Sequence, residues 1–175
     1  MSPKQWDSLK DDGKIASETR VVLGSVGIGI FVKKGAARPD IGSIASLKQA
    51  LLEARSIAVR DAAGGSPVGS YVISLLERLG IAAELKPKLR LTADRPYRAV
   101  IAGDAEIGFS TMTEILETPE VDVVGPLPDE VQNVLSFVAA IPKNAKNGAG
   151  AKALIDFLSS PKARAVFRSR GIQPG

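Results

Sequence analysis

The hydrophobic pattern of the chain alternates between short apolar runs and longer stretches with helical periodicity. Apolar runs rich in β-branched residues predict strands at 20–33, 56–62, 88–92, 105–110, 121–127 and 134–142. Apolar residues at three- and four-residue spacing predict helices at 4–12, 46–54, 67–79, 94–102, 111–116, 148–158 and 161–170. Strands that alternate with helices of this length predict an α/β fold with a largely parallel sheet.

Capping residues set the expected ends of the central helices. Ser66 is placed as the N-cap of a helix that has Pro67 in its first turn and stops at Gly80. Ser46 and Asp94 are placed in the same way as the caps of the helices on either side.

Composition removes several classes of chemistry. The 175 residues include neither Cys nor His, which excludes disulfides, thiolate nucleophiles, His-based triads and imidazole metal sites. Carboxylate pairs such as Asp11 and Asp12 lie in polar contexts, so acid–base hydrolysis has no support. We therefore expect a protein that is not an enzyme and needs no metal or cofactor.

The charge balance points to a small anionic partner. Lys and Arg number 23 against 19 Asp and Glu, a net charge of +4. The basic residues are scattered and aromatic residues make up 5%, which does not favour a nucleic-acid groove. No apolar run approaches the roughly 20 residues needed to cross a bilayer. The first residues, MSPKQWDSLKDDGK, are polar and unlike a signal peptide, so a chain complete as given would be cytoplasmic.

The most informative stretch is 57–72, a buried strand, a Gly-rich turn and a helix. Such a turn presents backbone N–H groups and a positive helix dipole, which suit an oxyanion or a carboxylate. Ser66 and Ser70 could add hydroxyl donors, and Gly69 would permit close approach. An ordinary turn, in which Ser66 only caps its helix, explains the same residues.

Two further segments follow strands and could face the same crevice. One is the helix start near Tyr97, and the other is GFSTMT (108–113), whose hydroxyls include Ser110. Ligands in open α/β sheets bind beyond the carboxyl ends of strands, which makes these groups candidate donors. Helix and turn capping explain both segments equally well.

The ordered elements resemble the type II periplasmic solute-binding proteins of ABC importers, most closely the molybdate-binding family. The segments that carry the resemblance are VGIGIFVKKGAARPDI, SLKQALLEARSIAVRDAAGGSPVGSYVISLLERLGI, AVIAGDAEIGFS, VVGPLPDEVQNVLSFVAAIP and AKALIDFLSSPKARAVFRSRGIQP. The resemblance implies two α/β lobes, with mainly parallel sheets flanked by helices, that close on a ligand. Residues 1–38 and 136–175 would form a partial first lobe, and 39–135 the second.

The resemblance also implies ligand contacts and partners. A helix-start contact falls on Val68, within Pro67–Val68–Gly69, and a second falls on Tyr97. A tyrosine hydroxyl contact of the family falls at Phe109 or Ser110; because Phe109 has no hydroxyl, only Ser110 could replace it, which argues against specificity for molybdate. An importer permease would be the partner and the periplasm the location.

The family begins with two strand–helix units that have no counterpart here, including ligand donors of the first lobe. A truncated chain, a degenerate homologue, or a homo-oligomer in which copies complete each other would each explain this. Binding of an oxyanion such as molybdate, or of another small anion, is the function expected first. A cytoplasmic ligand-sensing domain of the same fold, as in transcription regulators, is the alternative.

Overall fold

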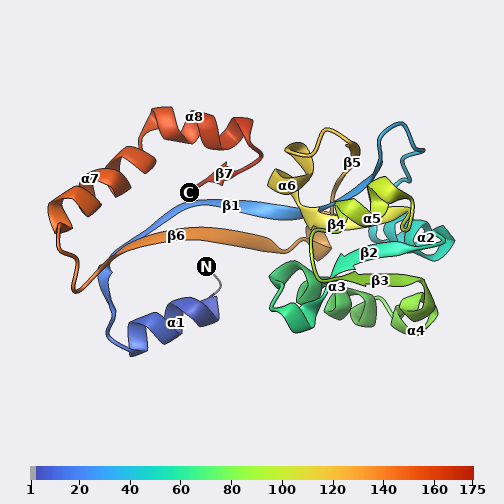
Figure 1. Ribbon diagram of the computed structural model, residues 1–175, viewed down its shortest axis with the longest axis horizontal. Coiled ribbons are helices and arrows are strands. Elements are labelled where there is room, and N and C mark those ends of the chain that lie inside the picture. The colour runs from blue at the N-terminus through green and yellow to red at the C-terminus, as the bar shows by residue number, and fades with distance from the viewer. Residues whose placement is uncertain (1–2) are drawn as a thin grey trace. The chain divides into compact units, whose positions relative to one another are not determined.

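The computed structural model describes residues 3–175 and divides into two compact units. Unit 1 comprises the chain up to Val26 together with Val134–Gly175, and unit 2 comprises Gly27–Asn133 (Figure 1). The sequence predicts lobe boundaries at 38/39 and 135/136, whereas the compact units meet at 26/27 and 133/134. Residues 28–33 lie in unit 2 because they pair with its strands. The first two residues of the expected first lobe lie outside the described residues.

Unit 1 is built on the first part of a long strand. Its elements are α1 (Pro3–Asp11), β1 (Ile15–Lys33, shared with unit 2), β6 (Val134–Pro142), α7 (Gly148–Leu158), α8 (Pro161–Ser169) and β7 (Gln173–Pro174). Strands β6 and β7 both pair with β1, and β7 runs antiparallel to it with Gly24 opposite Pro174. The predicted strand 134–142 and the two closing helices are confirmed.

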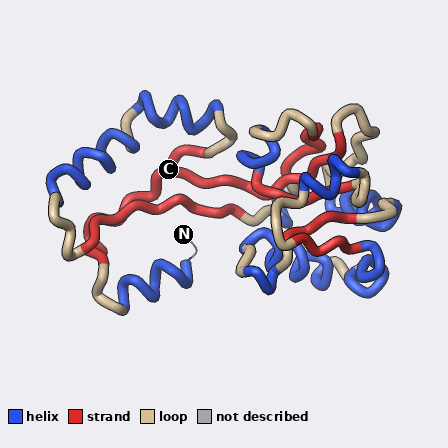
Figure 2. Tube along the Cα trace, in the orientation of Figure 1, coloured by secondary structure: helices blue, strands red, loops and turns tan. Residues whose placement is uncertain are grey.

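Unit 2 holds the α/β sheet. Its helices are α2 (Ile44–Glu53), α3 (Pro67–Arg78), α4 (Ala82–Leu85), α5 (Tyr97–Ala102) and α6 (Met112–Leu116), with the 3₁₀ turns η1 (Ala62–Gly64), η2 (Lys86–Lys88) and η3 (Asp129–Val131). Its strands are β2 (Ile57–Arg60), β3 (Leu89–Thr92), β4 (Ile107–Thr111) and β5 (Val121–Pro126), in the order β3-β2-β4-β1-β5. Strands β3, β2 and β4 are parallel, and β1 runs antiparallel to β4 and β5. Four of these five strands therefore point the same way, which agrees with the predicted mainly parallel sheet. Figure 2 distinguishes the strands, in red, from the helices, in blue.

Helices cover both faces of this sheet. Helix α3 packs on β2 and β4 through a stripe of fully buried residues, among them Val72, Leu75 and Leu76. Helix α5 packs on β2, β4 and β5, where Phe31, Ala58, Val100, Ala105, Ile115 and Val121 form a core cluster. Side chains alternate between faces along a strand, so Ile57 and Val59 point away from Ala58, toward the face that α3 covers.

Two of the expected caps need correction. Ser66 is the N-cap of α3 and Gly80 follows its end in the left-handed conformation, as predicted. Helix α2, however, starts earlier than expected, with Ser43 as its N-cap and Ser46 as the N3 partner in a capping box. Helix α5 starts at Tyr97 with Pro96 at the N-cap position and no side-chain cap, so Asp94 does not cap it.

Unit 1 has little interior of its own. Its buried positions among the described residues are Ile15, Gly24, Val26 and Ala163. Large apolar side chains on β6, α7 and α8 are 40–57% exposed, namely Val134, Phe137, Leu154, Phe157 and Val166. The apolar faces of these elements therefore lack a covering layer within the described residues.

Within residues 3–175, none of the helices combines the length and apolar character that crossing a membrane requires.

Candidate functional site

The carboxyl ends of three parallel strands in unit 2 bring the predicted site segments to one edge of the sheet. Arg60, at the end of β2, lies opposite Thr92, at the end of β3, and Asp61 donates its N–H to the carbonyl of Thr92 at 2.9 Å. Strand β4 continues past its last pair with β2, so Ser110 reaches the same edge. This is the edge at which open α/β sheets bind ligands.

The start of α3 offers one backbone donor. Ser66 is buried, and its Oγ accepts the N–H of Gly69 at 3.0 Å, while its carbonyl accepts the N–H of Ser70 at 3.0 Å. Pro67 has no N–H. The first-turn donor that the helix does not use is therefore the N–H of Val68, at the positive end of a 12-residue helix.

Gly69 acts in packing. A Cβ at this position would lie 2.0 Å from the carbonyl oxygen of Arg60 and 3.2 Å from the nitrogen of Ala62. The start of α3 therefore rests against the end of β2, which positions Val68. The sequence predicts that Gly69 lies at the ligand; in the structure its missing side chain makes room for protein backbone, and its N–H bonds to Ser66.

The start of α5 places a cation beside Tyr97. Arg95 donates from Nη1 to the hydroxyl of Tyr97, and its guanidinium carbon lies 5.7 Å from the centre of the Tyr97 ring. The hydrogen bond to Tyr97, with the charge of Glu114 as a lesser cause, raises the pKa of Arg95 above its ordinary value. The neighbouring Arg98 is paired instead with Asp94 at 3.0 Å.

The end of β4 holds the other two predicted residues. Phe109 is fully buried in the core. Ser110 is 3% exposed, and its hydroxyl donates to Oε2 of Glu114 one turn into α6. Phe109 and Ser110 point to opposite faces of the sheet, because side chains alternate along a strand. The hydroxyl near this edge thus comes from Ser110, and it is held by a carboxylate.

Sequence reasoning missed Arg95 and Glu114. Both lie within segments that the sequence singles out, but only for backbone donors and hydroxyls. The signal that could have found Glu114 is its four-residue spacing from Ser110, across a strand end and a helix start. No comparable spacing relates Arg95 to Glu114, because these residues follow different strands, β3 and β4, which end at the same edge of the sheet.

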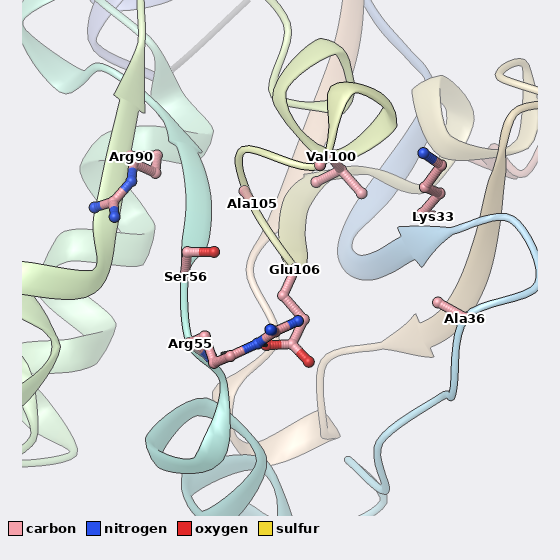
Figure 3. A pocket seen from close by; sticks show the side chains of 9 residues that line it. Lys33, Ala36, Arg55, Ser56, Arg90, Val100, Ala105 and Glu106 are labelled. Carbon is pink, nitrogen blue, oxygen red and sulfur yellow. Dashed lines mark hydrogen bonds and ion pairs between the residues drawn. The ribbon is translucent and has the colours of Figure 1, made fainter.

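A separate cavity of about 430 Å³ lies elsewhere in unit 2. It lies near the starts of β2 and β4, the opposite edge of the sheet, and is lined by Lys33, Ala36, Arg55, Ser56, Arg90, Val100, Gly103, Ala105 and Glu106 (Figure 3). None of the six predicted site residues lines it. Its single carboxylate, Glu106, accepts the backbone N–H of Arg55 at 2.9 Å and the Arg55 Nε at 3.4 Å.

The described residues contain no cluster of three or more acidic side chains that could hold a metal ion. The groups at the carboxyl edge of the sheet include the backbone donor of Val68, the guanidinium of Arg95, the carboxylate of Glu114 and hydroxyls. Such a set can bind an anion.

Comparisons with known proteins agree with this fold. Over 171 residues the chain is 26% identical to the molybdate-binding protein ModA of Escherichia coli (strain K12), covering 96% of this chain and 66% of ModA. The structure of the Azotobacter vinelandii periplasmic molybdate-binding protein matches with a TM-score of 0.73 at 18% identity, over 98% of this chain and 75% of that one. The fold is that of a type II solute-binding protein, near the molybdate-binding ones.

The family model for bacterial extracellular solute-binding proteins matches residues 1–173, and the chain belongs to that family. The chain is also 31% identical over 169 residues to an aconitate isomerase of Pseudomonas sp, covering 96% of this chain and 63% of that protein. The chain thus spans just under two thirds of the length of these curated relatives.

Proposed function

We propose that this protein binds a small anionic solute at the edge of the unit 2 sheet where β2, β3 and β4 end. The observation that carries the proposal is the N–H of Val68, held at the start of α3 by the Ser66 cap and by the packing of Gly69 on Arg60. A backbone donor fixed before the ligand arrives replaces the anion's hydration without reorganisation. Tyr97 is proposed as a further contact at the same edge, whereas the hydroxyl of Ser110 already donates to Glu114.

We place this binding in transport, with the permease of an ABC importer as partner and the periplasm as location. The proposal is supported by the family and by the molybdate-binding relatives. The anion would be an oxyanion or an organic acid, and both classes can be tested on the same protein.

The test is a thermal-shift panel on the 175-residue chain with molybdate, tungstate, sulfate, phosphate and small carboxylates. An anion at 100 times its dissociation constant stabilises the native state by about 2.7 kcal/mol, which raises the unfolding midpoint visibly. No shift with any of these anions would refute the proposal.

Two variants assign the site. Val68→Pro removes the donor at a first-turn position that tolerates proline, and is expected to abolish the shift. Ser66→Ala is the matched control, which weakens the cap by about 1 kcal/mol but keeps the Val68 N–H. Anion binding that survives in a folded Val68→Pro protein would show that the site lies elsewhere.

A second candidate function is isomerisation of an unsaturated tricarboxylate. It is favoured by the aconitate isomerase relative, which matches 96% of this chain at 31% identity. The test is to incubate the purified chain with each geometric isomer of aconitate and follow the other by proton NMR. Interconversion above the buffer rate would support an enzyme, and its absence beside measurable binding would support a binding protein.

We also propose a homodimer that covers the apolar faces of unit 1. The five exposed apolar side chains support it, because they lie on β6, α7 and α8, and α7 packs against both of the other elements. Apolar surface of this kind can be covered by a partner. Light scattering should give twice 18.3 kDa, and Phe157→Glu should reduce this to the monomer. The matched control is Leu116→Glu, which changes a side chain 52% exposed in unit 2. A wild-type chain that is monomeric at all concentrations would refute the dimer.

A further inference from the structure

Arg95 follows the end of β3, and Glu114 is hydrogen-bonded to Ser110 at the end of β4, so both charged side chains belong to the edge of the sheet at which the anion is proposed to bind. We infer that they form a selectivity pair, which favours organic carboxylates over tetrahedral oxyanions such as molybdate. The inference rests on the proposed function, since it concerns the chemical class of the solute that binds at the same edge. The roles of Arg95 and Glu114 are separate from that of the Val68 N–H, which binds the anion through the backbone.

Arg95 is held in place by its neighbours. Its Nη1 donates to the hydroxyl of Tyr97, and its guanidinium lies against the Tyr97 ring. Tyr97 in turn packs against the core cluster formed around Phe31 and Val100. The side chain of Arg95 is exposed, so its remaining N–H groups are available to solvent. A guanidinium fixed in this way presents a planar fork that matches the two oxygens of a carboxylate.

Glu114 works against a compact dianion. Its Oε2 accepts the hydroxyl of Ser110, which fixes the carboxylate at the end of β4. A tetrahedral dianion concentrates its charge within one small volume, so a fixed carboxylate nearby repels the whole ion. The same carboxylate occupies the buried hydroxyl of Ser110, which could otherwise donate to an oxyanion.

An organic acid avoids this conflict because its charges are separated by carbon atoms. One carboxylate can pair with Arg95 and another with the N–H of Val68, while uncharged C–H or O–H groups face Glu114. The site is therefore one for small di- or tricarboxylates.

The experiment measures dissociation constants for aconitate, citrate and molybdate by titration calorimetry on the full chain and three variants. We expect the wild type to bind a tricarboxylate at least tenfold more tightly than molybdate. Arg95→Gln should weaken the tricarboxylate about tenfold, the usual scale for a charge-assisted hydrogen-bond pair. It should weaken molybdate by a smaller factor, because the lost charge attracts both anions but the planar fork matches only a carboxylate. Glu114→Gln keeps an acceptor for Ser110 and should tighten molybdate several-fold.

Arg98→Gln is the matched control. It removes the same charge from the same segment, but from a side chain already paired with Asp94. We expect its affinities to stay within about twofold of the wild type for every anion, because a paired surface cation contributes little. Circular dichroism on each variant checks the fold.

The outcomes separate the inference from the proposed function. Molybdate binding more tightly than the tricarboxylates would overturn the selectivity pair and leave anion binding intact. The same would follow if Arg95→Gln and Arg98→Gln reduced tricarboxylate affinity equally, because the effect would then be one of net charge. Binding of no anion by the wild type would refute the proposed function, and the inference with it.

Discussion

Gly69 sets how closely α3 approaches the end of β2, and Gly69→Ala tests this packing directly. The new Cβ would lie 2.0 Å from the carbonyl oxygen of Arg60, a backbone atom that cannot rotate away. Relief requires α3 or the turn after β2 to move, and overpacking of this kind costs about 1–3 kcal/mol. Alanine returns up to about 1 kcal/mol through its helix propensity. We expect a net loss of about 1–2 kcal/mol in the free energy of unfolding, measured by urea denaturation.

Gly64→Ala is the control within the same turn. A Cβ at Gly64 would point into open space, with no heavy atom of a non-neighbouring residue within 4 Å, and the φ of Gly64 is not in the left-handed region. Because the new methyl group contacts nothing in the folded state, Gly64→Ala acts only by lowering the conformational entropy of the unfolded chain. It should therefore leave the free energy of unfolding unchanged or raise it by about 0.4–1 kcal/mol. If Gly69→Ala were as stable as Gly64→Ala, α3 would not approach β2 as closely as described. The contact between them would then not fix the position of the Val68 N–H.

Two further predictions concern polar groups of unit 2. The side chain of Gln132 accepts the N–H of Ile28 at 2.8 Å and donates to the carbonyl of Ile28 at 3.1 Å. Gln132→Met should therefore lower the free energy of unfolding by about 1–3 kcal/mol, measured by urea denaturation. The control Gln49→Met changes an exposed side chain and should lower it by almost nothing. The N–H of Gly35, more than the nearby Arg38, holds the pKa of Asp122 below its ordinary value, against the opposing effect of burial. A lowered folded-state pKa gives stability that is full above the ordinary pKa of about 4 and is lost as the pH falls through the lowered value. The wild type should therefore lose more stability than Asp122→Asn between about pH 5 and pH 3; equal losses would show that Asp122 makes no such contribution.

The strand and helix pattern was predictable because each element carries its own signal. The apolar periodicity of α3, with Ser66 before it and Gly80 after it, indicates both ends of that helix. The misplaced caps share a cause. Ser46 can reach back to Ser43 and Asp94 lies near Pro96, so several residues in one short stretch could cap a helix. Local sequence cannot rank such neighbours, since the choice depends on where the helix meets the sheet.

The candidate site was predictable in its place but only partly in its chemistry. A helix that starts after a buried strand indicates a donor at the carboxyl edge, and this pattern identifies Ser66 and Val68. That Arg95 and Glu114 belong to one edge depends on the order β3-β2-β4, in which β3 and β4 flank β2 and run parallel to it. Adjacent residues can also have different roles. Phe109 is next to Ser110 in sequence, but side chains alternate along β4, and that of Phe109 is buried in the core.

The packing of α3 also bears on how the anion would bind. The Val68 N–H is held by two contacts that exist without a ligand. Ser66 caps the start of α3, and Gly69 packs against the backbone of Arg60. Arg95 is likewise held by Tyr97. A donor set ordered by the core does not lose conformational entropy when the ligand arrives, so affinity should depend on how well the anion's charges match these fixed positions. This is why exchanging one side chain, Glu114→Gln, should change which anion is preferred more than it changes the stability of the fold.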